Sequence, residues 1–421
     1  MSDSQSLEAL GKRCDPASIL PPELLTAILL LVCDGRPDTI CKLVLVSCVW
    51  RSFVSEEPQL WTRITIDDHL YRLGGSASDD LQSRRERTLR FVKCCISRSK
   101  SALLDITLDW NADDYESPFS DQVTAKEIIL QLMGEDGEHS KRWRSLTWLE
   151  DGGNGITLWD FVGLLPPVMP NLRRVRLFGL TWKPRDEDRW SNKTTPLFPH
   201  SPALRNLELV RFEGRHLQDS FLSQIGYSSI SALTYEAARR WMLHDIARLN
   251  SFYALQTLTI RTGWSFGILE GGRMVPETRH PQVEGISDPS KLPTIQLPNL
   301  RTLCLSLRNR PHMSILVLSL LRSPRLENLE FRLCGRTKKP YSSELSKFAD
   351  CACDLLRQVK TIRLDTYFQP CQNLESDLVY FLERARSLRE LLLCPALAAL
   401  VGRRLEEETK HAGWNFSICI S

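Results

Sequence analysis

The chain has 421 residues, of which 42% are hydrophobic and 25% are charged, with a formal net charge of +3 at pH 7. This length and composition are typical of a globular protein with about two or three domains. The near balance of charge argues against a nucleic-acid-binding protein or a membrane-surface protein. The 13 cysteines lack the spacing of a zinc site, and the N-terminus lacks the pattern of a secretion signal. We therefore expect a cytoplasmic or nuclear protein with reduced thiols, no metal and no cofactor.

The first organised segment follows a leader, residues 1–18, that is expected to be mobile. The Pro21-Pro22 pair can open a helix, because proline is tolerated in a first helical turn. Apolar residues then recur at helical spacing until the sequence DGRPD interrupts them. Asp38 is expected to cap a second helix that runs to about Phe53.

Both expected helices are apolar on more than one face. Leu30 and Leu31 lie off the main stripe of the first helix, and Leu45 and Val49 lie off that of the second. A helix of this kind requires burial on several sides, yet a unit of about 45 residues rarely forms a sufficient core. Each large side chain left in water forfeits about 1.5–3 kcal/mol. The rest of the chain or another protein is therefore expected to cover the surplus.

The same segment contains a fixed order of Leu-Pro-x-Glu-Leu-Leu, Ile-Leu, Leu-x-x-Val, Trp-Arg and Pro-x-Leu-Trp. The residues that supply it are Leu20, Pro21, Glu23, Leu24, Leu25, Ile28, Leu29, Leu43, Val46, Trp50, Arg51, Pro58, Leu60 and Trp61. On these residues the segment resembles an F-box, although Ser47 stands where that family often has cysteine. The resemblance places an F-box-like domain at residues 19–63. An ordinary helical hairpin that packs on its own domain is the alternative.

The resemblance implies that this domain docks on the Skp adaptor of a cullin–RING, SCF-type ubiquitin ligase. The domain also resembles the large, divergent F-box families of mushroom-forming (basidiomycete) fungi. The sequence alone does not say which of its apolar residues pack inward. The residues expected to bind the adaptor are Leu20, Pro21, Leu24, Leu25, Ile28, Leu43, Val46, Trp50, Leu60 and Trp61.

Residues 64–100 are expected to link this domain to the remainder of the chain. Leu81, Leu89, Val92 and Ile96 predict an amphipathic helix there. The arginines of the same stretch are then a solvated helix face and not a nucleic-acid patch.

Residues 101–421 repeat the pattern apolar-x-x-apolar-x-apolar. The last two apolar residues of each unit share one face of a short strand, and helix-like stretches separate the units. The pattern resembles a degenerate leucine-rich-repeat array, in which only Asn111 and Cys334 match that family's turn-capping position. A generic α/β domain is the alternative. The units begin at Leu103, Trp143, Leu172, Leu204, Ile230, Leu255, Leu300, Leu326, Val359 and Leu388, and FSICI near the end is an expected closing strand.

The expected fold class is therefore α/β, with a small all-α F-box-like unit before an irregular leucine-rich-repeat solenoid. Three inserted loops, residues 110–122, 181–201 and 262–298, are too long for tight turns. The third has a side-chain mixture suited to protein recognition. Its candidate target-binding residues are Trp264, Phe266, Arg273, Met274 and His280.

One motif points to catalysis. The sequence GWSFG at residues 263–267 fits the nucleophile elbow of hydrolases, with Ser265 as the nucleophile. That elbow requires a helix directly after the serine, whereas two glycines and a proline follow here. We therefore expect no enzyme, with an esterase-like hydrolase as the weaker alternative.

The predicted function is that of a substrate-receptor subunit. The F-box-like helices would bind the Skp adaptor and, through it, the cullin–RING ligase. The repeat domain would bind a target protein that the sequence does not name, and neither nucleic acid nor a membrane is expected as a partner. A repeat scaffold without ligase engagement is the other alternative.

Overall fold

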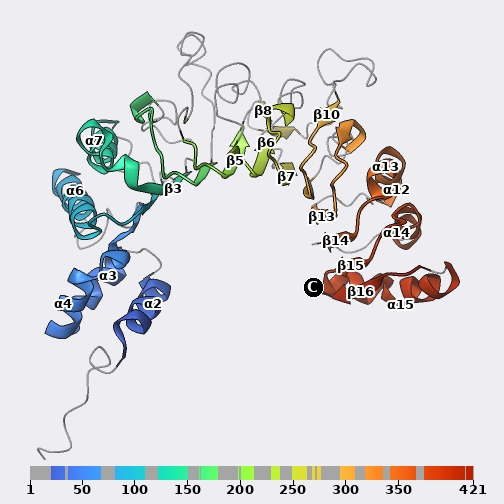
Figure 1. Ribbon diagram of the computed structural model, residues 1–421, viewed down its shortest axis with the longest axis horizontal. Coiled ribbons are helices and arrows are strands. Elements are labelled where there is room, and N and C mark those ends of the chain that lie inside the picture. Colours follow the sequence, from blue (N-terminus) through green and yellow to red (C-terminus); the bar gives the residue numbers. More distant parts are fainter. Residues whose placement is uncertain are drawn as a thin grey trace, which may run out of the picture. The chain divides into compact units, whose positions relative to one another are not determined.

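The computed structural model divides the chain into two compact units, Met1–Leu172 (unit 1) and Arg173–Ser421 (unit 2). Both units contain helices and parallel strands (Figure 1). The expected leader, residues 1–18, lies outside the described residues. The structure describes residues 20–33, 37–67, 81–109, 122–149, 161, 163–178, 198, 201–212, 229–237, 249–262, 268–270, 273–275, 294–308, 318–334, 342–366, 374–412 and 414–420.

Unit 1 begins with the short helices α2 (Pro22–Cys33), α3 (Pro37–Leu43) and α4 (Cys48–Glu56), and a 3-10 turn, η1 (Pro58–Trp61). The expected first helix is confirmed. The expected continuous second helix is wrong, because the chain turns at residues 44–46 between α3 and α4. The hydroxyl of Ser47 accepts the N–H of Trp50 at 3.2 Å and caps α4. A serine in this place satisfies a free helix N–H and so begins a new helix.

The sheet of unit 1 has three parallel strands, β1 (Arg63–Ile66), β2 (Leu104–Asp109) and β3 (Trp143–Leu149). Helix α6 (Leu81–Arg98) lies between β1 and β2 in the chain, and α7 (Gln122–Met133), η3 (Glu135–Gly137) and η4 (Ser140–Arg142) lie between β2 and β3. The predicted linker helix is therefore confirmed as α6. Strand β1 was not predicted, although Trp61, Ile64 and Ile66 have the same spacing as the later repeats. All three side chains are buried.

The sheet of unit 2 has nine parallel strands that follow one another in chain order. Each predicted repeat and the closing segment coincide with a strand, so the repeat prediction is confirmed. The fold is the expected α/β, leucine-rich-repeat-like array. Its strands are β4 (Arg174–Phe178), β5 (Asn206–Phe212), β6 (Ala232–Ala237), β7 (Thr257–Thr262), β11 (Thr302–Arg308), β13 (Asn328–Cys334), β14 (Thr361–Thr366), β15 (Glu390–Leu393) and β16 (Ser417–Ile420).

Successive repeats of unit 2 are joined by a backbone ladder where the strands begin. The carbonyl of Arg205, for example, accepts the N–H groups of Ser231 and Ala232, both at 2.9 Å. The carbonyl oxygens of Arg173, Ser231, Gln256, Arg301, Glu327 and Lys360 each accept two N–H groups of the next repeat in the same way. This ladder satisfies backbone N–H groups at the start of each following strand.

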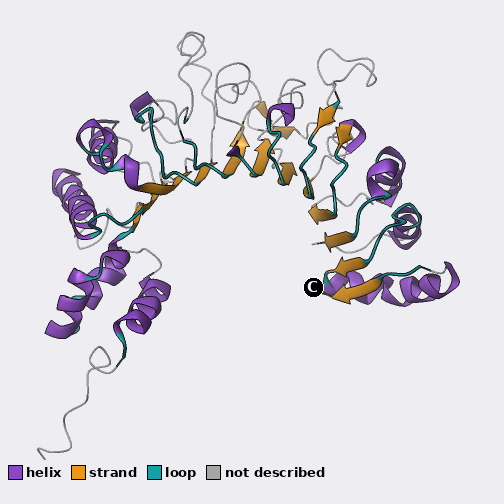
Figure 2. Ribbon diagram, viewed as in Figure 1, coloured by secondary structure: helices purple, strands orange, loops and turns teal. Residues whose placement is uncertain are grey.

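Helices α12 (Ser342–Cys351), α13 (Cys353–Leu356), α14 (Leu374–Leu382) and α15 (Pro395–Ala412) cover one face of the later strands of unit 2 (Figure 2). Phe331 of β13 packs against Phe348 of α12 at 5.4 Å and Phe381 of α14 at 5.6 Å between ring centroids. Helix α15 was not predicted. Its buried residues Leu397 and Val401 follow the helical spacing that was its signal.

Two small sheets accompany the main one. Strand β10 (Ile295–Gln296) pairs in parallel with β12 (Leu321–Arg322). Strands β8 (Ile268–Glu270) and β9 (Arg273–Val275) form an antiparallel hairpin within the expected third loop. The sequence has Gly271-Gly272 between them, a typical two-residue hairpin loop, so the hairpin could have been predicted from the sequence.

Candidate functional site: an apolar surface on the first helices

The first helices of unit 1 leave large apolar side chains in contact with solvent. We call these residues the apolar set. They are exposed by 42% to 83% of their surface, whereas apolar residues of this size are mostly buried in a folded chain. Their number in so short a segment indicates a surface that contacts a partner. The set comprises Leu24, Ile28, Leu31 and Val32 of α2, Leu45 and Val46 of the turn, and Val49 of α4.

Helix α2 is apolar on two adjacent faces. Leu25 and Leu29 are four residues apart and are each only 2% exposed, so they form the face that packs inside unit 1. Leu24, Ile28 and Leu31 follow the same helical spacing one position away and form the second, exposed face. The surplus of apolar surface expected from the sequence therefore remains uncovered by the described parts of the chain.

The turn between α3 and α4 is held by polar contacts on its two sides. The cap of Ser47 fixes the start of α4, and the Arg51 Nε donates to the carbonyl of Val44 at 3.1 Å. Between these contacts the chain exposes Leu45 by 75% and Val46 by 61%. Because the backbone of the turn is restrained, these side chains are held outward at low entropic cost to a partner.

The predicted adaptor-binding residues divide into three groups. Four are exposed: Pro21, Leu24, Ile28 and Val46. Three are half-buried: Leu20, Leu43 and Trp50. Three are core residues of unit 1: Leu25, Leu60 and Trp61. The last group supports the surface from inside and does not form it, whereas adaptor binding by the other seven stays a prediction.

The prediction omitted Leu31, Val32, Leu45 and Val49, which the structure adds to the exposed surface. The sequence feature that could have identified them is the presence of apolar residues outside the main apolar stripe of each expected helix. The sequence indicates that such a surplus exists. It does not indicate which of two neighbouring faces turns inward.

Trp61 joins the first helices to the rest of unit 1. Its indole N–H donates to the carbonyl of Val54, in α4, at 2.6 Å. The guanidinium carbon of Arg98, at the end of α6, lies 4.5 Å from the centroid of the indole ring. A single buried side chain therefore links α4, η1 and α6.

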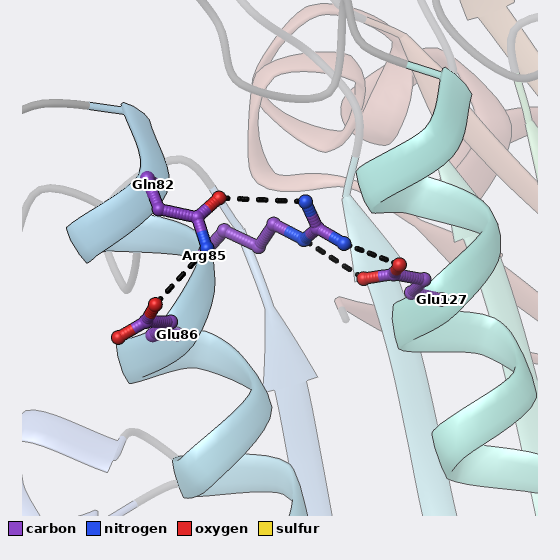
Figure 3. Close-up of polar contacts among 4 residues, drawn as sticks. All are labelled: Gln82, Arg85, Glu86 and Glu127. Atoms are coloured by element: carbon purple, nitrogen blue, oxygen red, sulfur yellow. Dashed lines mark hydrogen bonds and ion pairs between the residues drawn. The ribbon is translucent and has the colours of Figure 1, made fainter.

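The linker helix α6 is also fixed to α7. The Arg85 guanidinium forms a two-pronged ion pair with the Glu127 carboxylate, in which Nε lies 2.8 Å from Oε2. Figure 3 shows this pair between the two helices, with Gln82 placed to accept a further bond from Arg85 at 3.4 Å. The planar fork of arginine favours one geometry of the pair. The α6 helix is thus a packed part of unit 1.

The open face of the unit 2 sheet carries ion pairs. Glu208 of β5 lies 3.4 Å from Arg176 of β4 and 3.6 Å from Arg261 of β7. Glu330 and Arg332 of β13 pair at 2.7 Å. These arginines alternate with the buried residues of their strands, as the two-residue period of a strand requires. Each of these three arginines therefore has a carboxylate partner on this face.

Most of the predicted target-binding loop lies outside the described residues. Strand β9 contains Arg273 and Met274, which stand opposite Glu270 and Leu269 in the hairpin. Trp264, Phe266 and His280 lie outside the described residues, as do Asn111 and the GWSFG segment with Ser265. Loop residues 110–121 and most of 181–201 also lie outside them.

Within the described ranges, no three His, Cys, Asp or Glu side chains are placed to hold a metal ion. No helix in the part of the chain that the structure describes has the length and apolar character needed to cross a membrane.

Residues 17–67 match the family model described as F-box-like. The matched residues span α2, α3, α4, η1 and β1, so the whole apolar set belongs to an F-box-like domain. No curated protein matches the chain. Among solved structures, the chain is similar to the leucine-rich repeat-containing protein LegL7 from Legionella pneumophila. The sequence identity is 14% and the TM-score 0.34, and the match covers 66% of this chain and 82% of LegL7.

Proposed function

We propose that this chain is a substrate-receptor subunit of an SCF-type cullin–RING ubiquitin ligase, active in the cytoplasm or the nucleus. The F-box-like domain binds the Skp adaptor, and the repeat domain holds a target protein. The observation that carries the proposal is the apolar set, which is exposed on a domain of this family.

The whole apolar set is needed for a stable complex. Full burial of one large apolar side chain contributes about 1.5–3 kcal/mol, and association costs about 4–15 kcal/mol in lost freedom of motion. One or two side chains do not offset that cost, whereas the joint burial of α2, the turn and the start of α4 does. A charge placed in the middle of the set therefore has a large effect on binding.

The role of this chain is positional. Other subunits carry out ubiquitin transfer, and the receptor raises the effective concentration of the target near the charged enzyme. The ordered junction of α4, η1 and α6 supports this role, since a packed junction holds the F-box-like domain in a defined orientation to strands β1–β3.

The test is binding of the purified chain to a purified Skp adaptor. Leu24→Asp and Val46→Asp are each expected to abolish binding, because each places a charge in the apolar set. Leu130→Asp is the matched control, since Leu130 is 45% exposed on α7 of the same unit, outside the F-box-like domain. Circular dichroism checks that all three variants are folded. Adaptor binding by Leu24→Asp at the strength of the wild type would refute the proposal.

A chain that does not bind the adaptor at all would instead be a repeat scaffold without ligase engagement. Affinity purification with mass spectrometry during proteasome inhibition addresses the target. The expected result is a ubiquitin-carrying protein that co-purifies with the wild-type chain. The same protein should co-purify with the Leu24→Asp variant without ubiquitin.

A further inference from the structure

The strands of unit 2 begin at one edge of the sheet, which we call the leading edge. The residue before each strand from β4 to β15 gives its carbonyl to the backbone ladder described above. These residues therefore stand in one row in strand order, although they are far apart in the sequence. The row is Arg173, Arg205, Ser231, Gln256, Arg301, Glu327, Lys360 and Arg389. Five of these eight positions are cationic.

The cations are most concentrated between β11 and β15. Arg301, Arg325, Arg386 and Arg389 are exposed there, and we call them the arginine strip. Arg325 donates to the Asn299 Oδ1 at 3.0 Å. Within the described residues no carboxylate lies in ion-pair distance of any of these four arginines.

Two carboxylates in this part of the chain are already paired with other cations. Glu327 is bonded to Lys360 at 2.6 Å, and Asp354 to Arg357 at 3.2 Å. The pKa of Glu327 is lowered by the hydrogen bond from Lys360, and the charges of Arg301 and Arg389 lower it further. This electrostatic effect indicates that Arg301 and Arg389 act on the same part of the edge. Glu383 and Glu390 flank Arg386 and Arg389 in the sequence, and among the described residues neither forms an ion pair with an arginine of the strip.

The contrast with the open face of the sheet is informative. There Arg176, Arg261 and Arg332 all have carboxylates within 3.6 Å. The four arginines of the arginine strip have no carboxylate at ion-pair distance among the described residues, so their guanidinium groups are available to an anionic partner. Guanidinium groups bind carboxylates in a two-pronged geometry, which makes them suited to acidic side chains.

We propose that the arginine strip binds an acidic segment, rich in Asp and Glu, of the target protein. Arg301 and Arg389 are three strand steps apart, or about 14 Å at a spacing of about 4.8 Å per step. An extended peptide covers this distance with about four or five residues. The proposal rests on the target-binding half of the proposed function and does not depend on adaptor docking.

A peptide fits the strip better than a nucleic acid does. The chain has a net charge of only +3, whereas nucleic-acid-binding domains are strongly basic. Glu327 and Glu390 also stand among the arginines, where they would repel evenly spaced phosphates. An acidic peptide can place neutral residues opposite these two carboxylates.

The test uses the full chain and a fluorescein-labelled peptide of alternating Glu and Gly, with binding measured by anisotropy at low salt. The double variant Arg301→Ala/Arg389→Ala is expected to weaken binding about fivefold, which is near the middle of the range for the loss of two surface ion pairs. The matched control is Arg90→Ala/Arg403→Ala, which removes the same charge from exposed arginines of α6 and α15. That control is expected to change binding less than about twofold.

A second double variant, Arg325→Ala/Arg386→Ala, is expected to weaken peptide binding to a similar extent. It keeps the test decisive if the first variant does not fold. Equal weakening by the strip variants and by the Arg90/Arg403 control would overturn the proposal. Tighter binding of a single-stranded oligonucleotide of equal charge would overturn the choice of an acidic peptide.

The same preparations are tested for binding to the Skp adaptor. A wild-type chain that binds the adaptor and not the peptide refutes this inference alone. A wild-type chain whose strip binds the peptide but which does not bind the adaptor supports the inference and refutes the ligase role.

Discussion

Replacement of Trp61 tests whether one side chain couples the F-box-like helices to the rest of unit 1. Trp61 is only 3% exposed, so Trp61→Ala removes a large buried ring and is expected to lower the free energy of unfolding by about 3–5 kcal/mol. Trp61→Phe keeps much of the ring but removes the N–H that bonds to Val54. The buried carbonyl then lacks this partner, at a cost of about 1–3 kcal/mol.

Trp143 provides a matched control in the same unit. It is fully buried in β3, and its indole nitrogen has no hydrogen-bond partner within the described residues. Trp143→Phe therefore removes a similar ring without the loss of a hydrogen bond. It also removes a buried polar group that has no partner, which by itself is stabilising.

Urea denaturation of the full chain, followed by far-ultraviolet circular dichroism, measures both replacements. The transition assigned to unit 1 should fall by about 1–3 kcal/mol more in Trp61→Phe than in Trp143→Phe. Arg98→Ala, which removes the cation above the Trp61 ring, should cost about 0.5–1 kcal/mol. If Trp143→Phe proved as damaging as Trp61→Phe, the hydrogen bond to Val54 would not be the coupling we describe.

Three further predictions concern glycine, aspartate and cysteine. Gly134→Ala should lower the free energy of unfolding by about 1 kcal/mol or more, because φ is +77° at this residue and an added Cβ would lie 2.7 Å from the His139 side chain. Gly402 lies within α15, and an added Cβ there would meet open space. Gly402→Ala should therefore raise the free energy of unfolding by up to about 1 kcal/mol. Thermal melts compare them, and similar shifts of the two would contradict this reasoning. Burial alone raises the pKa of Asp105, but hydrogen bonds from Arg144 and Ser145 outweigh it and lower the pKa overall. Asp105→Asn should therefore lower the free energy of unfolding by about 1 kcal/mol at neutral pH. The difference from the wild type should disappear as pH falls through the lowered pKa of Asp105 in the folded protein. Urea titrations at several pH values measure this difference. Burial raises the pKa of Cys304 to about 12. Iodoacetamide at neutral pH should therefore label this thiol only after denaturation, because the thiolate is the reactive form. Labelled Cys304 in the native protein, detected by mass spectrometry, would contradict this prediction.

Local patterns in the sequence were enough to predict the nine strands of the unit 2 sheet. Leu303 and Leu305 of β11, for example, are both fully buried, and their two-residue spacing after Leu300 is plain in the sequence. Such a pattern is strong because alternate residues of a strand must point to one face. The F-box-like segment was predicted for a similar reason, since its apolar residues and prolines stand in a fixed local order.

Three features were decided by tertiary contacts. Leu24 and Leu25 are adjacent and equally apolar, and only the packing of α2 in unit 1 buries one and exposes the other. The helix break at residues 44–46 is accompanied by two contacts, the Ser47 cap and the bond from Arg51 to the Val44 carbonyl, which the spacing of apolar residues does not reveal. Strand β1 required a partner, β2, some 40 positions later in the chain.

The arginine strip illustrates the same limit at longer range. Arg301 and Arg389 have no relation in the sequence, and they share an edge because parallel strands align the residues that precede them. The sequence by itself determined which segments form the repeat strands of unit 2 and which helices carry surplus apolar surface, since both follow from the spacing of neighbouring side chains. Only the tertiary structure decided which faces remain open and which distant charges meet, because burial and electrostatic contact depend on positions in space.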